Sequence, residues 1–168
     1  PMEAAVKASG VPYTLLRAPM FHENVFGHAG SVKAQETGFA PLPPSHKFVT
    51  VGTDDLGKAA VLAAKAPEQH AGKTYNITAP AYSHEELVAA LNKALGRADV
   101  KYQQVPHDAV KQALAGFGMP AWQVDGVLEL WQAAADKKHH MTTHSGDFKT
   151  ITGTEPTTIE QFVAASKG

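Results

Sequence analysis

The sequence has no cysteine and no long hydrophobic run. A chain without cysteine forms no disulfide, holds no thiolate-bound metal and has no cysteine nucleophile. No apolar run approaches the roughly 18 residues that cross a bilayer. The N-terminal residues follow a helical pattern and lack the basic end and apolar stretch of a signal peptide. We therefore expect a cytoplasmic protein with no membrane partner.

The sequence also lacks an excess of charge of either sign. Lys and Arg together number 15, Asp and Glu together number 16, and the net charge is -1. Because no positive surplus attracts a polyanion, we expect no nucleic acid partner. The 168 residues, 43% hydrophobic and 18% charged, are typical of one folded globular domain.

The first ten residues look like the end of a helix that Gly10 closes. Position 1 is Pro and not an initiator Met. This pattern predicts that the chain is cut from something longer. The alternative is a processed N-terminus followed by a short first helix.

Strand and helix patterns alternate along the first half of the chain. Short runs of β-forming residues predict strands over residues 11–17, 48–51, 74–78 and 100–105. Helical spacing and capping signals predict helices over residues 53–66, 83–96, 106–115 and 121–135, a weaker one over 23–35, and a last one opened by a capping box at 157–160. Residues 18–22 and the proline-rich residues 38–47 are expected to be loops.

This alternation predicts an α/β fold, with a partial Rossmann-like parallel sheet and a mostly helical C-terminal lobe. Residues 11–17 are apolar on both faces, as in a parallel strand that helices cover on each side. No other long apolar strand is evident to pair with them. This is a second reason to expect a missing N-terminal half.

Several short motifs occur together in one order. Residues 10–24 combine a strand with Arg17-Ala18-Pro19, an aromatic residue and then Glu23-Asn24. Further motifs follow at residues 51–57, 70–78, 83–86 and 152–158. In order and spacing they resemble the NmrA-like family of atypical short-chain dehydrogenase/reductases, over nearly the whole chain but only the C-terminal half of a full member.

The resemblance implies a Rossmann-type protein that binds NADP or NAD, with NADP favoured. Family members include reductases of quinones and other carbonyl compounds, and redox-sensing regulators with little or no catalysis. In the family, a glycine-rich turn follows the first strand. The run Gly116-Phe117-Gly118 is not that turn, because it lies between predicted helices and not after a strand, and no G-x-G-x-x-G occurs in the sequence. We therefore expect residues 1–168 to be the C-terminal part of an NAD(P)-binding domain without its glycine-rich half, and to bind NADPH weakly or not at all alone.

The resemblance also assigns a cofactor-binding loop, which follows the carboxyl end of the predicted strand 11–17. Its residues are Pro19, Met20, Phe21, His22, Glu23 and Asn24. Phe21 and His22 are expected to border the nicotinamide ring. The backbone around Pro19 and Met20, with the Asn24 amide, is expected to orient it. From the residues alone, the alternative is a strand-to-helix turn in which Asn24 caps and Phe21 packs.

Other polar candidates favour structural roles. Arg17 would neutralise a phosphate or pair with a carboxylate, and we favour the pair. Asp54 and Asp55 fit the first turn of a helix better than acid–base catalysis. We assign no catalytic residue.

A metal site is not assigned either. His140 and His144 have the spacing of two ligands on a helix, but no acidic ligand lies in register with them. Trp122, Leu128 and Trp131 are spaced for the core of the helical lobe; alternatively, one of them roofs a substrate pocket.

Three functions remain open. The first is an NAD(P)H-dependent oxidoreductase acting on a quinone or small carbonyl compound, in which this chain supplies the nicotinamide-side loop and the substrate lobe. The second is a non-catalytic NADP(H)-sensing regulator that binds a protein partner. The third is a free-standing interaction module without a cofactor.

Overall fold

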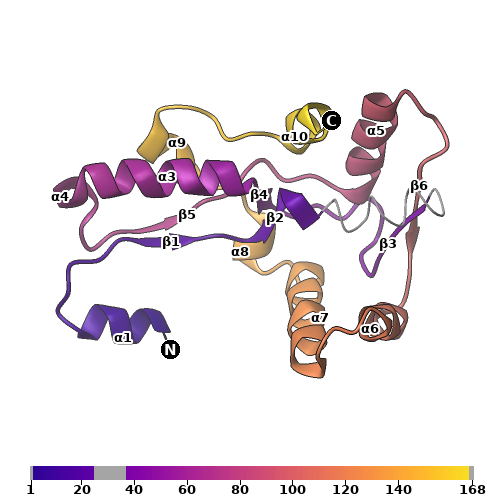
Figure 1. Cartoon of the computed structure of the whole chain (residues 1–168), viewed down its shortest axis with the longest axis horizontal. Coiled ribbons are helices and arrows are strands. Elements are labelled where there is room, and N and C mark those ends of the chain that lie inside the picture. The colour runs from indigo at the N-terminus through magenta and orange to yellow at the C-terminus, as the bar shows by residue number, and fades with distance from the viewer. Residues whose placement is uncertain (1, 25–36, 167–168) are drawn as a thin grey trace.

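The computed structural model describes residues 2–24 and 37–166. Strands and helices alternate in the first part of the chain, and helices dominate the second part (Figure 1). In chain order the elements are α1 (Met2–Ala8), β1 (Leu15–Arg17), β2 (Met20–Phe21), the 3-10 turn η1 (His22–Asn24), β3 (Thr37–Ala40), β4 (Thr50–Val51), α3 (Thr53–Lys65), α4 (Pro67–His70), β5 (Thr74–Asn76), α5 (His84–Leu95), β6 (Lys101–Gln104), α6 (His107–Gly116), α7 (Ala121–Ala135), α8 (His139–Thr142), α9 (Asp147–Thr152) and α10 (Ile159–Ala165).

The described strands form three parallel pairs, which are β1 with β5, β2 with β4, and β3 with β6. The segment after β5 connects two of these pairs. Its Ile77 N–H donates to the Arg17 carbonyl at 2.8 Å, and its Ala79 N–H donates to the Thr50 carbonyl at 2.8 Å. Parallel strands joined through helices confirm the predicted α/β class.

The first predicted strand is shorter and less buried than expected. Only Leu15–Arg17 pair in a ladder, and Val11 is 63% exposed. Its partner among the described strands is not a long apolar one, because Leu15 aligns with Thr74 in the three-residue strand β5. Sheet pairing uses backbone groups, so the half-polar strand β5 serves as well as a long apolar one.

Two predicted loops contain strands. Residues 38–47 begin within β3, which ends at Ala40, directly before the first of the prolines that made this stretch look irregular. Residues 18–22 contain β2, which pairs with β4. Of the predicted helix 23–35, Glu23 and Asn24 belong to η1, and residues 25–35 lie outside the described residues.

Helix starts follow the predicted capping signals with small shifts. Ser83 and Glu86 form the predicted capping box of α5, and Gly96 closes that helix in the left-handed conformation. The second box is one residue later than predicted, with Thr158 as the cap of α10. At α3 the cap position is Gly52, and Thr53 is already helical.

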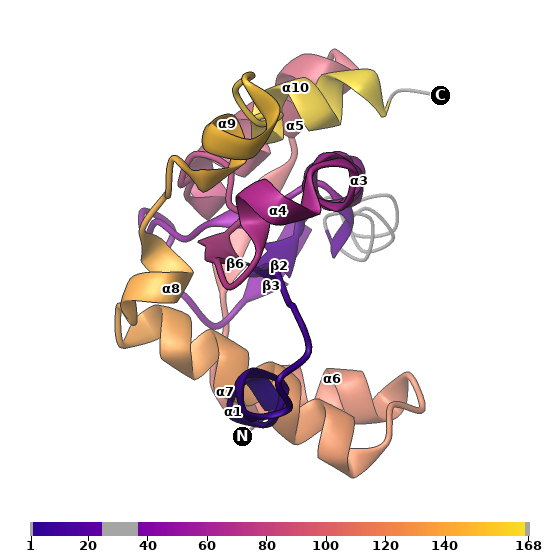
Figure 2. The same cartoon turned by 90° about the vertical axis from the view of Figure 1, so that its left-hand side faces the viewer.

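Two hydrophobic clusters hold the elements together. One joins the β4 and β5 region to α3 and α9 through Val51, Ala59, Tyr75, Ile77 and Phe148. The other joins the residues before β4 to α5, α7, α8 and α10 through Leu42, Phe48, Tyr82, Leu87, Ala134, Met141, Ile159 and Val163. In Figures 1 and 2, the strands lie between α3, α9 and α10 on one side and the α6–α7 hairpin on the other.

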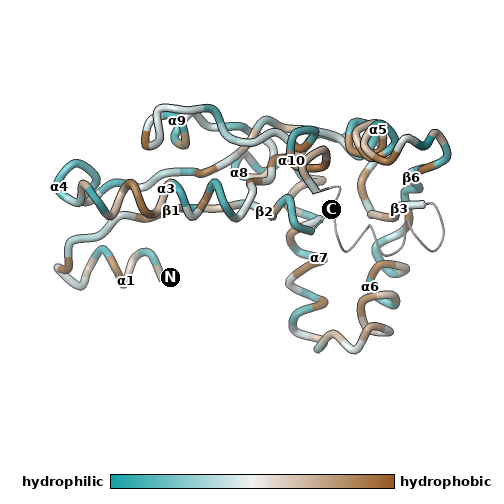
Figure 3. The backbone as a smooth tube through the Cα atoms, turned by 45° about the horizontal axis from the view of Figure 1, so that its top comes forward, coloured by the Kyte–Doolittle hydropathy of each residue, from teal (hydrophilic) through white to brown (hydrophobic). Residues whose placement is uncertain are grey.

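The α6–α7 hairpin extends away from the strands. Hydrophobic positions run along both of its helices (Figure 3), yet α6 has no fully buried residue. No helix among residues 2–24 and 37–166 is long and apolar enough to cross a membrane.

Candidate functional site

The predicted cofactor loop forms β2 and η1, beside β4. Pro19 is half-buried between β1 and β2. Three residues of the loop line a small cavity of about 30 Å³. The full lining is Met20, Phe21, Asn24, Phe48, Thr50, Tyr82, His84, Leu87 and Trp131. The cavity therefore joins the loop to β4, to the start of α5 and to α7.

Aromatic rings make up most of the far wall of this cavity. The Phe48 and Tyr82 ring centroids lie 4.8 Å apart, and Trp131 meets Phe48 edge-on at 5.9 Å. His84 stacks on Tyr102 at 4.4 Å with an interplanar angle of 17°. Offset and edge-on packing of this kind holds rings in defined orientations.

His22 is fully buried and bonded through both ring nitrogens. Its Nε2 lies 2.9 Å from the Thr157 carbonyl, and its Nδ1 lies 2.5 Å from Thr50 Oγ1. Because a carbonyl only accepts, Nε2 carries the proton of the neutral ring, and the Thr50 hydroxyl donates to Nδ1. His22 thus links β2 to β4 and to the segment before α10.

Burial lowers the pKa of His22 below its ordinary value, although the Thr157 carbonyl and the nearby carboxylates of Glu23, Asp55 and Glu160 oppose that shift. The buried ring is therefore neutral at pH 7. Both ring nitrogens of His22 are hydrogen-bonded, and the ring lies 5.3 Å from that of Phe162. His22 therefore holds the loop in place through its buried contacts.

Tyr82 extends this polar chain to the cavity. Its hydroxyl lies 3.4 Å from Thr50 Oγ1. Burial raises the pKa of Tyr82 to about 12. Tyr82 therefore presents a neutral phenol among the residues that line the cavity.

Glu23 holds the start of α3. Its Oε1 accepts from the Thr53 backbone N–H at 2.9 Å and from the Thr53 hydroxyl at 2.6 Å, so a carboxylate from η1 serves where a capping side chain usually does. Burial alone would raise the pKa of Glu23, but these donors lower it below its ordinary value. Its Oε2 is buried without a donor among the described residues.

The remaining candidates have structural partners. Arg17 forms a two-point ion pair with Glu3 of α1, with Nε 2.7 Å from Oε1, which confirms the structural role we favoured. Asp54 and Asp55 lie in the first turn of α3, as predicted, and Asp55 Oδ2 accepts from the Thr157 N–H at 2.7 Å. Across residues 2–24 and 37–166, no group of three His, Asp or Glu residues could hold a metal ion.

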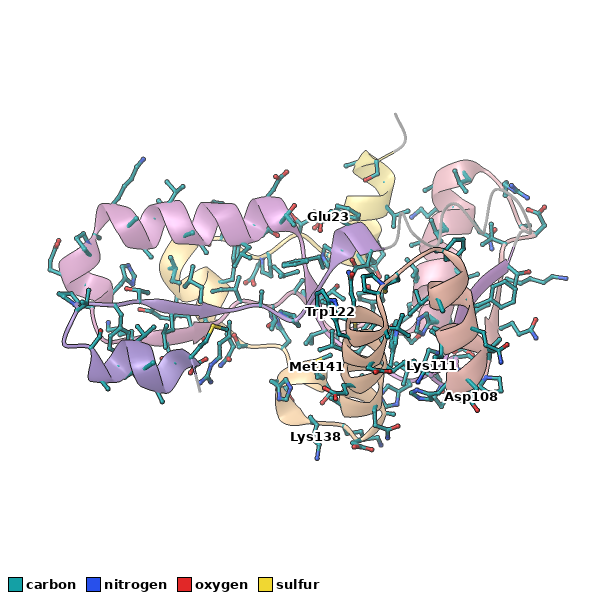
Figure 4. The ribbon with its side chains drawn as sticks, turned by 60° about the horizontal axis from the view of Figure 1, so that its bottom comes forward. Glu23, Asp108, Lys111, Trp122, Lys138 and Met141 are labelled. Atoms are coloured by element: carbon teal, nitrogen blue, oxygen red, sulfur yellow. The ribbon has the colours of Figure 1, made fainter. Side chains whose placement is uncertain are left out.

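The three apolar residues predicted for the lobe core have different environments. Trp131 packs at the cavity, Leu128 is half-buried, and Trp122 is 76% exposed near the start of α7 (Figure 4). Among the cavity residues, Tyr82 and His84 had no functional role assigned to them from the sequence. They flank Ser83, so the capping box was the available signal for their position at a helix start.

The chain's residues fit only one end of a dinucleotide. Met20 and Phe21 offer an apolar surface, and Asn24 offers an amide that both donates and accepts. No G-x-G-x-x-G turn occurs in the sequence to hold a pyrophosphate. These groups are of the kind that a nicotinamide ring and its carboxamide would need, and the contact of this loop with a cofactor stays a prediction.

The parallel strand pairs and the helices that join them define an α/β protein of Rossmann-like type. The chain belongs to the NmrA-like family, whose model matches residues 1–163. It is 32% identical over 130 residues to an NAD(P)H azoreductase from Xenophilus azovorans, an alignment that covers 77% of this chain and 44% of that protein.

Solved structures have the same fold. An NADPH-dependent quinone oxidoreductase from Escherichia coli superposes with a TM-score of 0.82 at 24% identity, over 97% of this chain and 58% of that one. NmrA, a negative transcriptional regulator in complex with NADP, superposes with a TM-score of 0.70 at 17% identity, over 98% and 55%. The chain thus spans about half the length of the proteins it matches.

Proposed function

We propose that this chain is the nicotinamide-side and substrate-side part of an NAD(P)H-dependent oxidoreductase, with NADP as the favoured cofactor and a quinone or small carbonyl compound as acceptor. One observation carries the proposal. Met20, Phe21 and Asn24 of the predicted loop line the same cavity as the aromatic wall of Phe48 and Trp131. A reduced nicotinamide and a flat acceptor need to meet at such a boundary.

In this proposal, the bound dinucleotide supplies the hydride and the chain supplies position. Met20 and Phe21 pack against the ring, while the Asn24 amide bonds to its carboxamide. The aromatic wall aligns the acceptor and excludes water. His22 and Glu23 act indirectly, since His22 fixes β2 against β4 and Glu23 fixes η1 to the start of α3.

Two measurements test the proposal. By calorimetry, the 168-residue chain alone should bind NADPH weakly or not at all, and sub-micromolar affinity would contradict the assigned role of the missing turn. In a protein that joins this chain to a glycine-rich βαβ unit, quinone-dependent NADPH oxidation should be measurable, and Asn24→Ala should raise the KM for NADPH. The exposed Gln123→Ala is the matched control.

The second candidate is a dinucleotide-sensing regulator, as in the solved NmrA structure. Its support is the exposed apolar side chains of the α6–α7 hairpin, Phe117 and Trp122, because exposed aromatic residues often mark protein contacts. NADPH binding without turnover of any quinone or carbonyl acceptor would favour this function over the first.

A further inference from the structure

A second, larger cavity lies away from the proposed cofactor loop. It has a volume of about 380 Å³, which is in the range of small-molecule sites. It lies where the loop between β3 and β4 meets the turn between α7 and α8. Its lining is Pro43, Ser45, His46, Lys47, Lys137 and Thr142.

Backbone and ring contacts hold the two walls together. His46 Nε2 donates to the Ala134 carbonyl at the end of α7, at 2.8 Å. The His46 N–H donates to the Pro43 carbonyl at 3.0 Å, which closes a turn. Further along, the Val49 N–H donates to the Met141 carbonyl at 2.9 Å. The relative position of the walls is thus set by bonds that do not involve the lysines.

The lining is basic and rich in donors. It contains two lysines, a histidine and two hydroxyl groups, and no carboxylate. Lys47 already forms an ion pair, because its Nζ lies 2.8 Å from Glu86 Oε1. The acidic neighbour of the other lysine, Asp136, accepts from Gln132 Nε2 at 2.8 Å. Lys137 therefore contributes the main free charge among the residues that form the cavity.

The backbone at Lys137 supports a role for its side chain. Its φ is 53°, which makes it the one non-glycine residue with a positive φ among residues 2–24 and 37–166. Glycine is the usual residue at such a position after a helix. A lysine there holds a backbone conformation that residues with a Cβ rarely adopt.

We propose that this cavity binds the phosphate group of a small molecule. Lys137 provides the principal charge, Lys47 adds to it, and the Ser45 hydroxyl donates to one of the remaining oxygens. The chemistry is that of charge-assisted bonds to a dianion. This site does not depend on the proposed redox function.

Calorimetry on the 168-residue chain tests the site, with phenyl phosphate and inorganic phosphate as probes. Lys137→Gly removes the charge and relieves the backbone, so we expect about tenfold weaker phenyl phosphate binding with thermal stability equal to or above that of the parent. The control Lys138→Ala removes the same charge one residue away, at a residue that does not line the cavity, and should change the affinity less than twofold.

Each outcome decides the proposal. If Lys137→Gly and Lys138→Ala weaken phenyl phosphate binding equally, the effect is one of general surface charge and the proposed site is wrong. The proposal is also wrong if the parent chain binds no phenyl phosphate. Benzoate that binds as tightly as phenyl phosphate would also overturn a phosphate site. Binding of both phosphates, lost in Lys137→Gly, supports it. A preference for phenyl phosphate then indicates an ester and a preference for inorganic phosphate indicates the free ion.

Discussion

The strand core buries its large hydrophobic residues, whereas the tip of the α6–α7 hairpin exposes two of its own. In the core, Phe148 of α9 is fully buried against the β4 and β5 region together with Val51 and Ile77. In the hairpin, Phe117 is 87% exposed and Trp122 is 76% exposed. Both regions are apolar in sequence, so apolar character alone does not show which one holds the fold together.

The candidate site lies where these regions meet. Its loop side, Met20 and Phe21, is paired with β4 of the strand core, while Trp131 comes from α7 of the hairpin. The loop positions are therefore tied to the more buried region, and part of the aromatic wall comes from the less buried one.

The largest expected effect contrasts two phenylalanines. Phe148→Ala should lower the free energy of unfolding by about 3–5 kcal/mol, because it leaves a void in a packed core. Phe117→Ala should change it by less than about 0.5 kcal/mol, since that ring lies in solvent. Urea unfolding followed by circular dichroism measures both. A similar loss for the two variants would show that the hairpin is packed like the core.

A smaller effect concerns the buried ring that fixes the loop. His22→Gln should destabilise the chain by about 1–3 kcal/mol, because the Thr50 and Thr157 groups lose well-placed partners. It should also remove part of the pH dependence of stability.

The sign of that dependence follows from the lowered pKa of His22. As pH falls below the ordinary value of 6.5, the unfolded chain binds a proton that the folded chain does not, so the contribution present at neutral pH is lost. Unfolding measured at pH 7.5 and pH 5 should show a smaller loss in His22→Gln than in the parent. The exposed His140→Gln is the control, and equal slopes for all three proteins would contradict the interpretation.

The smallest effect is expected within the hairpin. Lys111 Nζ of α6 lies 3.2 Å from Asp125 Oδ1 of α7, and both side chains are more than half exposed. A double-mutant cycle with Lys111→Ala and Asp125→Ala should give a coupling energy below about 1 kcal/mol that salt reduces further. A larger, salt-insensitive value would mean that this ion pair is shielded from solvent and that the hairpin is more rigid than its exposure indicates.

Local signals predicted the helices well. The Ser83 capping box and the terminal Gly96 lie where the sequence placed them, and α7 has the predicted bounds Ala121–Ala135. These features depend on residues within one or two helical turns of each other, so they can be predicted from the sequence alone. Short strands were harder, because β2 and β3 depend on partners that are distant in the chain.

The site was predictable only in part. The motif order pointed to residues 19–24, whose cofactor contact stays a prediction, as do the cytoplasmic location and the assignment of residues 1–168 to one part of a longer domain. Tyr82 and His84 were missed, because no local pattern relates the start of α5 to a loop some 60 residues earlier. Both line the cavity because the backbone of Tyr82 pairs with that of Phe48, which brings the start of α5 to the residues before β4.

Composition, helix caps and the ordered motifs were enough to establish an α/β chain of the NmrA-like family, because those signals are local and additive along the chain. The environment of each polar group was not accessible in that way. Folding decides which ring nitrogen of His22 carries the proton and brings Glu23 to the start of a helix 30 residues later in the chain. It also places Lys137 and His46 in the lining of the same cavity. Hydrogen bonds and burial depend on three-dimensional neighbours, and those come together only when the elements pack.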